Sequence, residues 1–300
     1  MIRIDNISKS YGERLALDSV SIHVDENEIF GLIGPDGAGK TSLFRILCSL
    51  ILPDSGNARI RNLDVVTDYR EVRKIIGYMP GRFSLYQDLT VEENLEFFAT
   101  VFGTSIKENY ELIKDVYEHI EPFKNRIAGK LSGGMKQKLA LSCALIHRPE
   151  VLILDEPTTG VDAVSRKEFW EMLTRIREEG ITIIVSTPYM DEAQLCDRVG
   201  LLQNGQLLTI NTPEGIIQAY PKDILSIQSD NLYNVLLDLR DYPLAHSTLL
   251  FGHEVHYTEK GKNIDQYQLK EYLNKKGHAN VEMNLMKPGI EDSFLELMKE

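Results

Sequence analysis

The first two thirds of the chain alternate between short apolar runs and segments whose apolar positions recur every three to four residues. Residues 29–33 ("IFGLI") and 151–155 ("VLILD") are almost continuously apolar, which predicts strands buried on both faces. Residues 20–24 ("VSIHV") alternate apolar and polar side chains, which predicts a half-buried strand. Further buried strands are expected at residues 74–79, 181–186 and 199–203.

Helical spacing begins directly after the first buried strand, at residues 39–50 ("GKTSLFRILCSL"). Three more segments have the same spacing and predict helices at residues 91–103, 133–146 and 165–179. Strands that alternate with helices indicate an α/β domain with a largely parallel sheet. We expect this domain to cover residues 1–220.

The tail, residues 221–300, has a different order of elements. It reads strand, helix, two strands, helix, strand, which indicates a small ferredoxin-like α+β module. The strands are expected at residues 224–228, 247–252, 254–259 and 281–286, and the helices at residues 232–239 and 265–277.

Composition narrows the class of protein. The 33 basic and 45 acidic residues leave a formal charge of −12, which argues against a nucleic-acid partner. The three cysteines, Cys48, Cys143 and Cys196, are widely spaced and odd in number, as expected for buried thiols in a reducing cytosol. The first residues lack the apolar core of a signal peptide, and no apolar run approaches the roughly 18 residues that span a bilayer. We therefore expect a soluble chain.

Residues 34–42 ("GPDGAGKTS") fit the phosphate-loop pattern G-x-x-x-x-G-K-[ST], with a predicted strand before and a predicted helix after. Backbone N–H groups and the helix N-terminus would face the phosphates. Lys40 would reach the β- and γ-phosphates, Thr41 would bind Mg²⁺, and Ser42 would touch the α-phosphate. We assign the whole loop to nucleotide binding, with the Asp36 side chain pointing outward: Gly34, Pro35, Asp36, Gly37, Ala38, Gly39, Lys40, Thr41 and Ser42.

An acidic pair follows the buried strand at residues 151–155. Asp155 would emerge at the carboxyl end of the sheet and hold Mg²⁺, and Glu156 would orient or deprotonate the attacking water. Alone, such a pair is equally compatible with an ordinary strand end; the phosphate loop favours the catalytic interpretation. Ser132, Gly133 and Gly134 open another predicted helix and form a second anion site, which invites the nucleotide of a partner.

Residues 131–166 resemble the signature helix, Walker B strand and D-loop of ATP-binding cassette (ABC) ATPases. Together with the phosphate loop, the resemblance extends over roughly residues 1–220. It implies a P-loop NTPase with a RecA-like core, an antiparallel β subdomain and a helical subdomain that carries the signature. It also implies ATP and Mg²⁺ as cofactors.

The resemblance assigns roles to further residues. Tyr11 in "SKSYGE" would stack on adenine. Ser132, Gly133 and Gly134 would contact the γ-phosphate that an opposing subunit holds. Asp162 would be the D-loop aspartate that bridges the two sites of a head-to-tail dimer.

Two positions depart from the family pattern. Gly81 stands where the family usually has a glutamine that senses Mg²⁺ and water, and Pro188 stands where it usually has the switch histidine. Gln87 is out of register, and His147 is better explained as a helix-end residue. Because proline offers neither a side-chain donor nor an N–H, we expect a weak site in a heterodimer. A homodimer in which Glu156 alone suffices is the competing interpretation.

Three classes of ABC protein compete: transporter motors, ribosome-acting proteins and DNA-repair ATPases. The single phosphate loop and the acidic charge favour a transporter motor. Its partners would be integral membrane permease subunits and a second ABC ATPase, either a paralogue or a second copy. The chain would be cytoplasmic and peripheral on the inner face of the membrane.

Two segments resemble those of bacterial drug, antibiotic and lipid-conjugate exporters: residues 81–103 and residues 285–298. The second is also compatible with a plain amphipathic terminal helix. Residues 81–94 would dock on the permease, because "RFSLYQDL" brings Phe83, Leu85 and Tyr86 close together without helical or strand spacing. The alternative is that Phe83 and Tyr86 fold back into the core.

Overall fold

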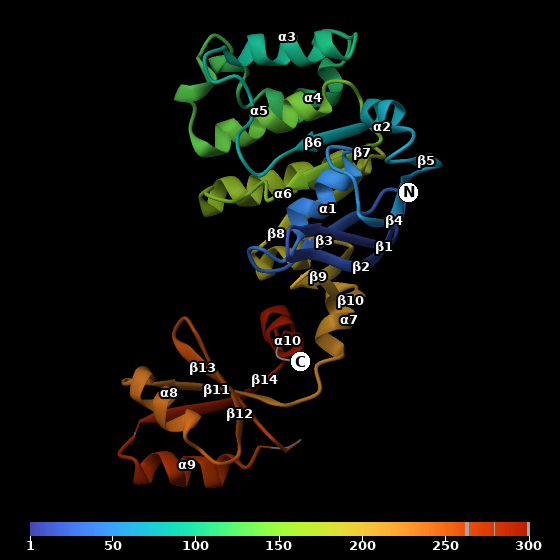
Figure 1. The fold of residues 1–300 in the computed structure, drawn as a ribbon. Coiled ribbons are helices and arrows are strands. Elements are labelled where there is room, and N and C mark those ends of the chain that lie inside the picture. The colour runs from blue at the N-terminus through green and yellow to red at the C-terminus, as the bar shows by residue number, and fades with distance from the viewer. Residues whose placement is uncertain (262–263, 279, 299–300) are drawn as a thin grey trace. The chain divides into compact units, whose positions relative to one another are not determined.

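The computed structural model describes residues 1–261, 264–278 and 280–298 and divides the chain into two compact units, Met1–Pro213 and Glu214–Glu300 (Figure 1). The division falls at helix α7 (Pro213–Gln218). An ATP-binding domain that ends at residue 220 stays a prediction. Within the described residues, no helix combines the length and the apolarity that crossing a bilayer requires.

A six-stranded sheet forms the centre of the first unit, in the order β10-β9-β3-β8-β7-β6. Neighbouring strands from β9 to β6 are parallel, and only β10 pairs in the antiparallel direction. The largely parallel sheet was predicted correctly, although α2 (Tyr69–Ile75) takes the first two residues of the strand expected at 74–79. The strands are β3 (Ile29–Ile33), β6 (Ile76–Met79), β7 (Val151–Asp155), β8 (Thr182–Thr187), β9 (Arg198–Gln203) and β10 (Gln206–Asn211).

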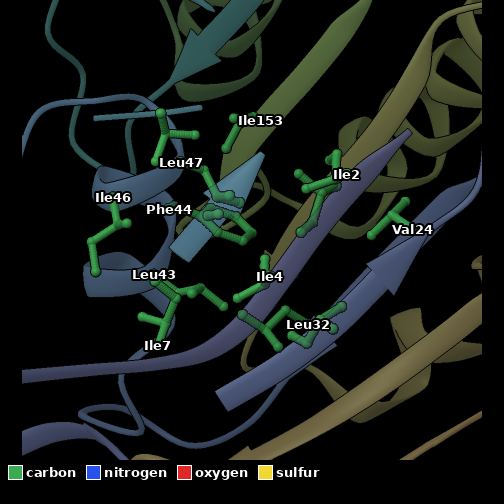
Figure 2. Close-up of a cluster of buried hydrophobic side chains, with 14 of the residues drawn as sticks. Ile2, Ile4, Ile7, Val24, Leu32, Leu43, Phe44, Ile46, Leu47 and Ile153 are labelled. Carbon is green, nitrogen blue, oxygen red and sulfur yellow. The ribbon is translucent and has the colours of Figure 1, made fainter. Parts of the chain in front are cut away.

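An antiparallel sheet, in the order β2-β1-β4-β5, packs beside helix α1 (Lys40–Leu47). Apolar side chains from β1, from α1 and from the central sheet interdigitate in one buried cluster (Figure 2). Burying a side chain such as Phe44 contributes about 1.5–3 kcal/mol and fixes the start of α1, where Lys40 lies. The strands of this sheet are β1 (Ile2–Tyr11), β2 (Arg14–Val24), β4 (Ser55–Ile60) and β5 (Leu63–Asp64).

The three expected longer helices are present, and α3, α4 and α5 gather in one group of the first unit (Figure 1). Thr90 caps α3 in a capping box with Glu93, so the helix begins where the sequence pattern predicts. The helices are α3 (Val91–Val101), α4 (Tyr110–Tyr117), α5 (Gly133–Leu145) and α6 (Ala163–Glu178). Two short 3₁₀ helices, η1 (Glu121–Phe123) and η2 (Ala128–Lys130), lie between α4 and α5, and η3 (Met190–Leu195) lies between β8 and β9.

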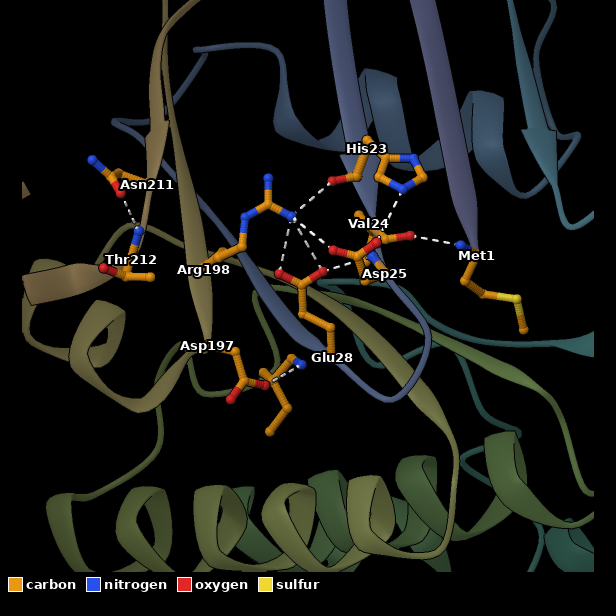
Figure 3. A network of polar contacts seen from close by, with 10 residues as sticks. Met1, His23, Val24, Asp25, Glu28, Asp197, Arg198, Asn211 and Thr212 are labelled. Atoms are coloured by element: carbon orange, nitrogen blue, oxygen red, sulfur yellow. Dashed lines mark hydrogen bonds and ion pairs between the residues drawn. The ribbon is translucent and has the colours of Figure 1, made fainter. Parts of the chain in front are cut away.

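Arg198 on β9 ties the central sheet to the antiparallel sheet (Figure 3). Its guanidinium lies 3.3 Å from Glu28 Oε1 and donates to the carbonyl oxygen of His23 at 3.3 Å. Burial raises the pKa of Glu28, and the N–H of Asp25 and the charge of Arg198 oppose that shift. Met1 adds its amino group, which donates to the carbonyl oxygen of Val24 at 2.8 Å. This network fixes the first strands against the sheet that carries the candidate site.

The second unit has the predicted ferredoxin-like order, and its antiparallel sheet runs β12-β13-β11-β14. Its apolar core combines one face of this sheet with α8 and α9. The elements are β11 (Ile224–Ser229), α8 (Leu232–Arg240), β12 (Ala245–Phe251), β13 (Glu254–Glu259), α9 (Gln266–Lys275), β14 (Val281–Met286) and α10 (Ile290–Leu297). Residues 290–297 thus form the terminal helix.

Candidate nucleotide site

The loop between β3 and α1 needs glycine at two positions. A Cβ at Gly34 would overlap the carbonyl oxygen of Leu202, and one at Gly39 would overlap that of Ala16. Gly39 also has a φ of 113°, in the left-handed region that glycine adopts without strain. The loop therefore passes close to two neighbouring backbones and turns directly into α1, whose first N–H groups face the loop.

A cavity of about 360 Å³ opens over this loop, within the usual size range of ligand pockets. Most of its lining residues were predicted from the sequence, and they come from segments that are far apart along the chain. Arg14 and Ala16 were not assigned. The lining residues are Tyr11, Arg14, Ala16, Gly37, Ala38, Gly39, Lys40, Thr41, Ser42 and Glu156. Asp36 is exposed, as expected.

Lys40 is the buried cation of the cavity, with 3% of its surface exposed. Its Nζ donates to the carbonyl oxygens of Gly34 at 2.8 Å and Pro35 at 3.1 Å, and lies 3.1 Å from Glu156 Oε1. These partners satisfy a buried ammonium group that would otherwise be costly. A phosphate in the cavity would compete with Glu156 for this cation.

Asp155 and Thr41 bring two hard oxygen ligands together at the carboxyl end of β7. Thr41 Oγ1 donates to Asp155 Oδ1 at 3.2 Å, and Ser186 Oγ donates to the same oxygen at 2.8 Å. Only 3% of Asp155 is exposed. Mg²⁺ is usually bound by one or two protein oxygens together with phosphates and water. The two side chains fit such a site.

Glu156 is held in an unusual backbone conformation, with a φ of 50°. Its N–H donates to the carbonyl oxygen of Ser186 at 3.1 Å and to Ser186 Oγ at 3.0 Å. Non-glycine residues in this region are strained and cluster at functional sites. The conformation presents the Glu156 carboxylate to Lys40 across the cavity.

Tyr11, the last residue of β1, offers a 48% exposed ring at the edge of the cavity, and Ser42 Oγ donates to its hydroxyl at 3.4 Å. Such a ring suits stacking on a base. Arg14 begins β2 and donates from Nη2 to the carbonyl oxygen of Gly37 at 3.4 Å. The signal that could have identified Arg14 is its place three residues after Tyr11, across a tight "YGER" turn.

The signature residues lie apart from this cavity: among the lining residues described for it, none is from 132–134 or is Asp162. Ser132 Oγ accepts from the Met135 N–H at 3.4 Å and caps α5. Asp162 Oδ1 accepts from the Ser165 N–H at 3.0 Å and caps α6, and this bond lowers the pKa of Asp162. A Cβ at Gly134 would lie 2.8 Å from Ser165 Oγ, so the starts of α5 and α6 are in close contact.

The two departures from the family pattern are Gly81, which lies beside Asp155, and Pro188, which comes directly after β8. A Cβ at Gly81 would lie 3.0 Å from the carbonyl oxygen of Asp155 and 3.9 Å from its Cγ. Position 81 therefore lies beside Asp155, the carboxylate expected to hold Mg²⁺, but carries no side chain. Pro188 directly follows β8.

Neither residue considered as a replacement belongs to the cavity. Gln87 is an exposed turn residue. His147 stacks on Phe102 with ring centroids 3.7 Å apart, and its Nε2 lies 2.9 Å from the carbonyl oxygen of Ile76. Burial lowers the pKa of His147. Both assignments, a loop residue and a helix-end residue, agree with the structure.

A second, apolar cavity of about 450 Å³ lies between the end of β6 and helices α3 and α5. Leu85 is buried on its wall, whereas Tyr86 beside it is 51% exposed and packs edge-on against Phe97 with ring centroids 4.9 Å apart. The lining residues are Cys48, Leu50, Arg73, Ile76, Tyr78, Met79, Pro80, Ser84, Leu85, Phe98, Phe102, Ala140, Cys143, Ala144 and His147.

Comparison with known proteins agrees with this geometry. Residues 17–159 match the family described as "ABC transporter". The Nod factor export ATP-binding protein I of Rhizobium sp. (strain N33) is 34% identical over 304 residues, covering 99% of this chain and 96% of that protein. The linearmycin resistance ATP-binding protein LnrL of Bacillus subtilis is 35% identical, covering 71% of this chain and 69% of that protein. The chain therefore belongs to the family of ABC transporter ATP-binding proteins.

Two further similarities refine the picture. The probable multidrug ABC transporter ATP-binding protein YbhF of Escherichia coli is 41% identical over 218 residues, but the chain spans only 38% of its length. Among solved structures, the ATP-binding cassette MJ0796, a dimer bound to ADP and phosphate, aligns with a TM-score of 0.64 and 29% identity. That alignment covers 71% of this chain and 98% of the cassette, which confirms the ABC ATPase fold of the first unit.

Proposed function

We propose that the chain is the ATP-binding and ATP-hydrolysing motor subunit of a membrane exporter, in which separate permease subunits carry the cargo. The observation that carries this proposal is that Lys40, Thr41 and Glu156 line one cavity, and that Asp155 accepts a hydrogen bond from Thr41. Lys40 binds the β- and γ-phosphates of ATP, and Tyr11 stacks on its base.

The two acidic side chains, Asp155 and Glu156, have different roles in hydrolysis. Asp155 and Thr41 hold Mg²⁺, which neutralises phosphate charge when bound. Glu156 orients the attacking water and accepts its proton. Because the N–H and carboxylate of Glu156 are held by Ser186 and Lys40, the group is already aimed into the cavity.

The permease partner is supported by the second cavity. Most of its lining residues are apolar, and the exposed ring of Tyr86 lies beside it. Buried apolar pockets next to exposed aromatic anchors are typical of protein interfaces. The relatives named for multidrug transport, Nod factor export and linearmycin resistance favour an exporter. The subunit would then lie on the inner, cytoplasmic face of the membrane.

We further propose that the site built on Lys40 turns over slowly and that a second ABC ATPase completes the motor. Position 81 faces Asp155 without a side chain, and Pro188 lacks a donor. Losing one donor that acts on developing charge typically costs about 10²–10³ in rate. The signature start at Ser132 is well formed, so it can serve the nucleotide of a paralogue. A second copy of this chain is the alternative partner.

Purification of the tagged chain from native membranes tests this function. The expected result is a stable complex with a polytopic permease whose vesicular transport requires ATP and falls with Asp155→Asn, because that variant weakens the hold on Mg²⁺. Asp36→Asn, an exposed residue of the same loop, is the matched control. Recovery of ribosomal proteins or DNA instead of a permease would contradict the proposal.

A further inference from the structure

Glu192 is a buried carboxylate outside the nucleotide cavity, with 2% of its surface exposed. Thr158 Oγ1 donates to its two oxygens at 2.8 and 3.1 Å, and Thr187 Oγ1 donates to Oε2 at 2.5 Å. The guanidinium of Arg166 donates from Nε to Oε1 at 3.1 Å. Four hydrogen bonds from three segments therefore converge on one side chain.

Each of these three segments lies next to a residue that the family resemblance places in the ATPase site. Thr158 lies two residues after Glu156, and Thr187 is the last residue of β8, immediately before Pro188. Arg166 lies in the first turns of α6, the helix that Asp162 caps. Glu192 thus joins the catalytic loop, the switch segment and the D-loop helix, although it touches none of the atoms that would react.

The catalytic loop needs such support because Glu156 has a strained backbone. On one side, Ser186 holds the Glu156 N–H. On the other side, the carbonyl oxygen of Thr158 accepts from the Val161 N–H at 3.2 Å, and the side chain of Thr158 is bound to Glu192. Without Glu192, the side chain of Thr158 would lose its hydrogen-bond acceptor, and the loop after Glu156 would lose this attachment.

The switch segment depends on the same carboxylate. Pro188 has no N–H to donate. The segment is instead held by Thr187 Oγ1, which accepts from the Tyr189 N–H at 3.0 Å while donating to Glu192. The guanidinium carbon of Arg166 lies 4.2 Å from the ring centroid of Tyr189. The segment therefore contacts the same guanidinium that pairs with Glu192.

We propose that Glu192 is a positioning residue for hydrolysis, which keeps Glu156 in its strained conformation and links that conformation to the D-loop helix. The proposal rests on the proposed role of Glu156. It predicts that loss of the Glu192 charge impairs ATP cleavage and leaves ATP binding intact, because the side-chain bonds described for Lys40, Thr41 and Ser42 go to other residues.

The test compares Glu192→Gln with Asp191→Asn in the full chain. Asp191 is the neighbouring acid; its side chain is 62% exposed and pairs with Arg166 at 3.0 Å, so it controls for the loss of one charge beside the guanidinium. The readouts are amide hydrogen exchange, affinity for a fluorescent ATP analogue, and single-turnover cleavage of radiolabelled ATP with the protein in excess.

For Glu192→Gln we expect exchange at residues 156–161 to accelerate about tenfold or more, since a local anchor is lost. Single-turnover cleavage should fall about tenfold or more, with affinity within about twofold. Asp191→Asn should resemble the parent in all three. Thr158→Val removes one donor at nearly constant volume and should shift exchange and cleavage in the same direction, which keeps the test valid if Glu192→Gln folds poorly.

Unchanged exchange at residues 156–161 in a folded Glu192→Gln protein would overturn the proposal. So would a parallel loss of affinity and cleavage with faster exchange throughout the first unit, because that pattern marks a purely structural role. Failure of the parent itself to bind ATP would instead refute the proposed function, and the exchange comparison would still decide the role of Glu192.

Discussion

At the residue scale, we propose that nucleotide binding depends on Lys40, a buried cation that donates to two carbonyl oxygens. Lys40→Ala should weaken ATP binding by one to two orders of magnitude, because hydrogen bonds to charged groups contribute about 1.5–3 kcal/mol. Equilibrium titration with a fluorescent ATP analogue measures the effect. Lys9→Ala, which removes a cation near the Tyr11 ring, is the control. Equal affinities for Lys40→Ala and the parent would refute the assignment.

Sequence reasoning found most of the cavity because its residues follow buried strands at fixed spacing. The phosphate loop follows β3, and Asp155 ends β7 with Glu156 directly after it, so the parallel sheet brings them together at one edge. Arg14 was missed because it reaches the cavity through a hairpin of the antiparallel sheet. Glu192 was missed because two of its partners, Thr158 and Arg166, lie far from it in the sequence and its importance depends on burial.

At the element scale, two histidine–carboxylate contacts join α10 to the sheet of the second unit. His256 Nδ1 lies 2.7 Å from Asp292 Oδ1, and His246 Nε2 lies 2.7 Å from Glu296 Oε1. Burial alone would lower the pKa of His256, but its bonds to Asp292 and Glu254 outweigh burial and raise it. The same cluster, with Ser226 the largest cause, lowers the pKa of Glu254 to about 2.

These shifts predict a pH-dependent attachment of α10. A raised histidine pKa stabilises the folded state fully below about 6.5, and this stabilisation is lost as the pH rises through the folded value. Glu254 stays ionised throughout that range, since its contribution is lost only as the pH falls toward about 2. Hydrogen exchange at residues 290–297, corrected for intrinsic rates, should therefore accelerate above neutral pH.

His256→Gln should remove this pH dependence, whereas His253→Gln, at an exposed turn residue, should retain it. A parent chain whose exchange at residues 290–297 does not change between pH 6 and pH 9 would contradict the charge-based attachment.

The loop at residues 81–94 is the element proposed to meet the permease. Tyr86→Ala should reduce the permease recovered with the tagged chain about tenfold, because an exposed aromatic anchor typically dominates an interface. Tyr233→Ala, at a 65% exposed tyrosine of α8, is the control. Equal hydrogen exchange of this loop with and without the permease would contradict the docking role.

Several helices with regular periodicity were predicted from sequence, but α4 was missed although Ile113, Val116 and Tyr117 form a regular buried face. The helices α3, α5 and α6 lie within two residues of their predicted starts. The strand β1 was not predicted, since its pairing is interrupted by register shifts around Asn6, whose φ is 50°. Such irregularities break the alternation on which strand prediction depends.

At the scale of the whole molecule, we propose an asymmetric motor. Glu156→Gln in this chain should reduce transport only mildly, whereas the equivalent substitution in the partner cassette should abolish it, because the partner would complete its site against Ser132 and hydrolyse there. Vesicular transport by the two singly substituted complexes measures the difference. If Glu156→Gln alone stops transport, the two sites contribute equally or this one dominates.

The most direct test of the account is a single-turnover assay of the purified chain with radiolabelled Mg-ATP. The account predicts that ATP binds in a Lys40-dependent manner and is cleaved slowly. A median enzyme turns over at about 10 s⁻¹, and the loss of one donor lowers that by about 10²–10³, so cleavage should be slower than about 0.1 s⁻¹. Cleavage at several per second would contradict the weak site, and binding that survives Lys40→Ala unchanged would contradict the nucleotide site itself.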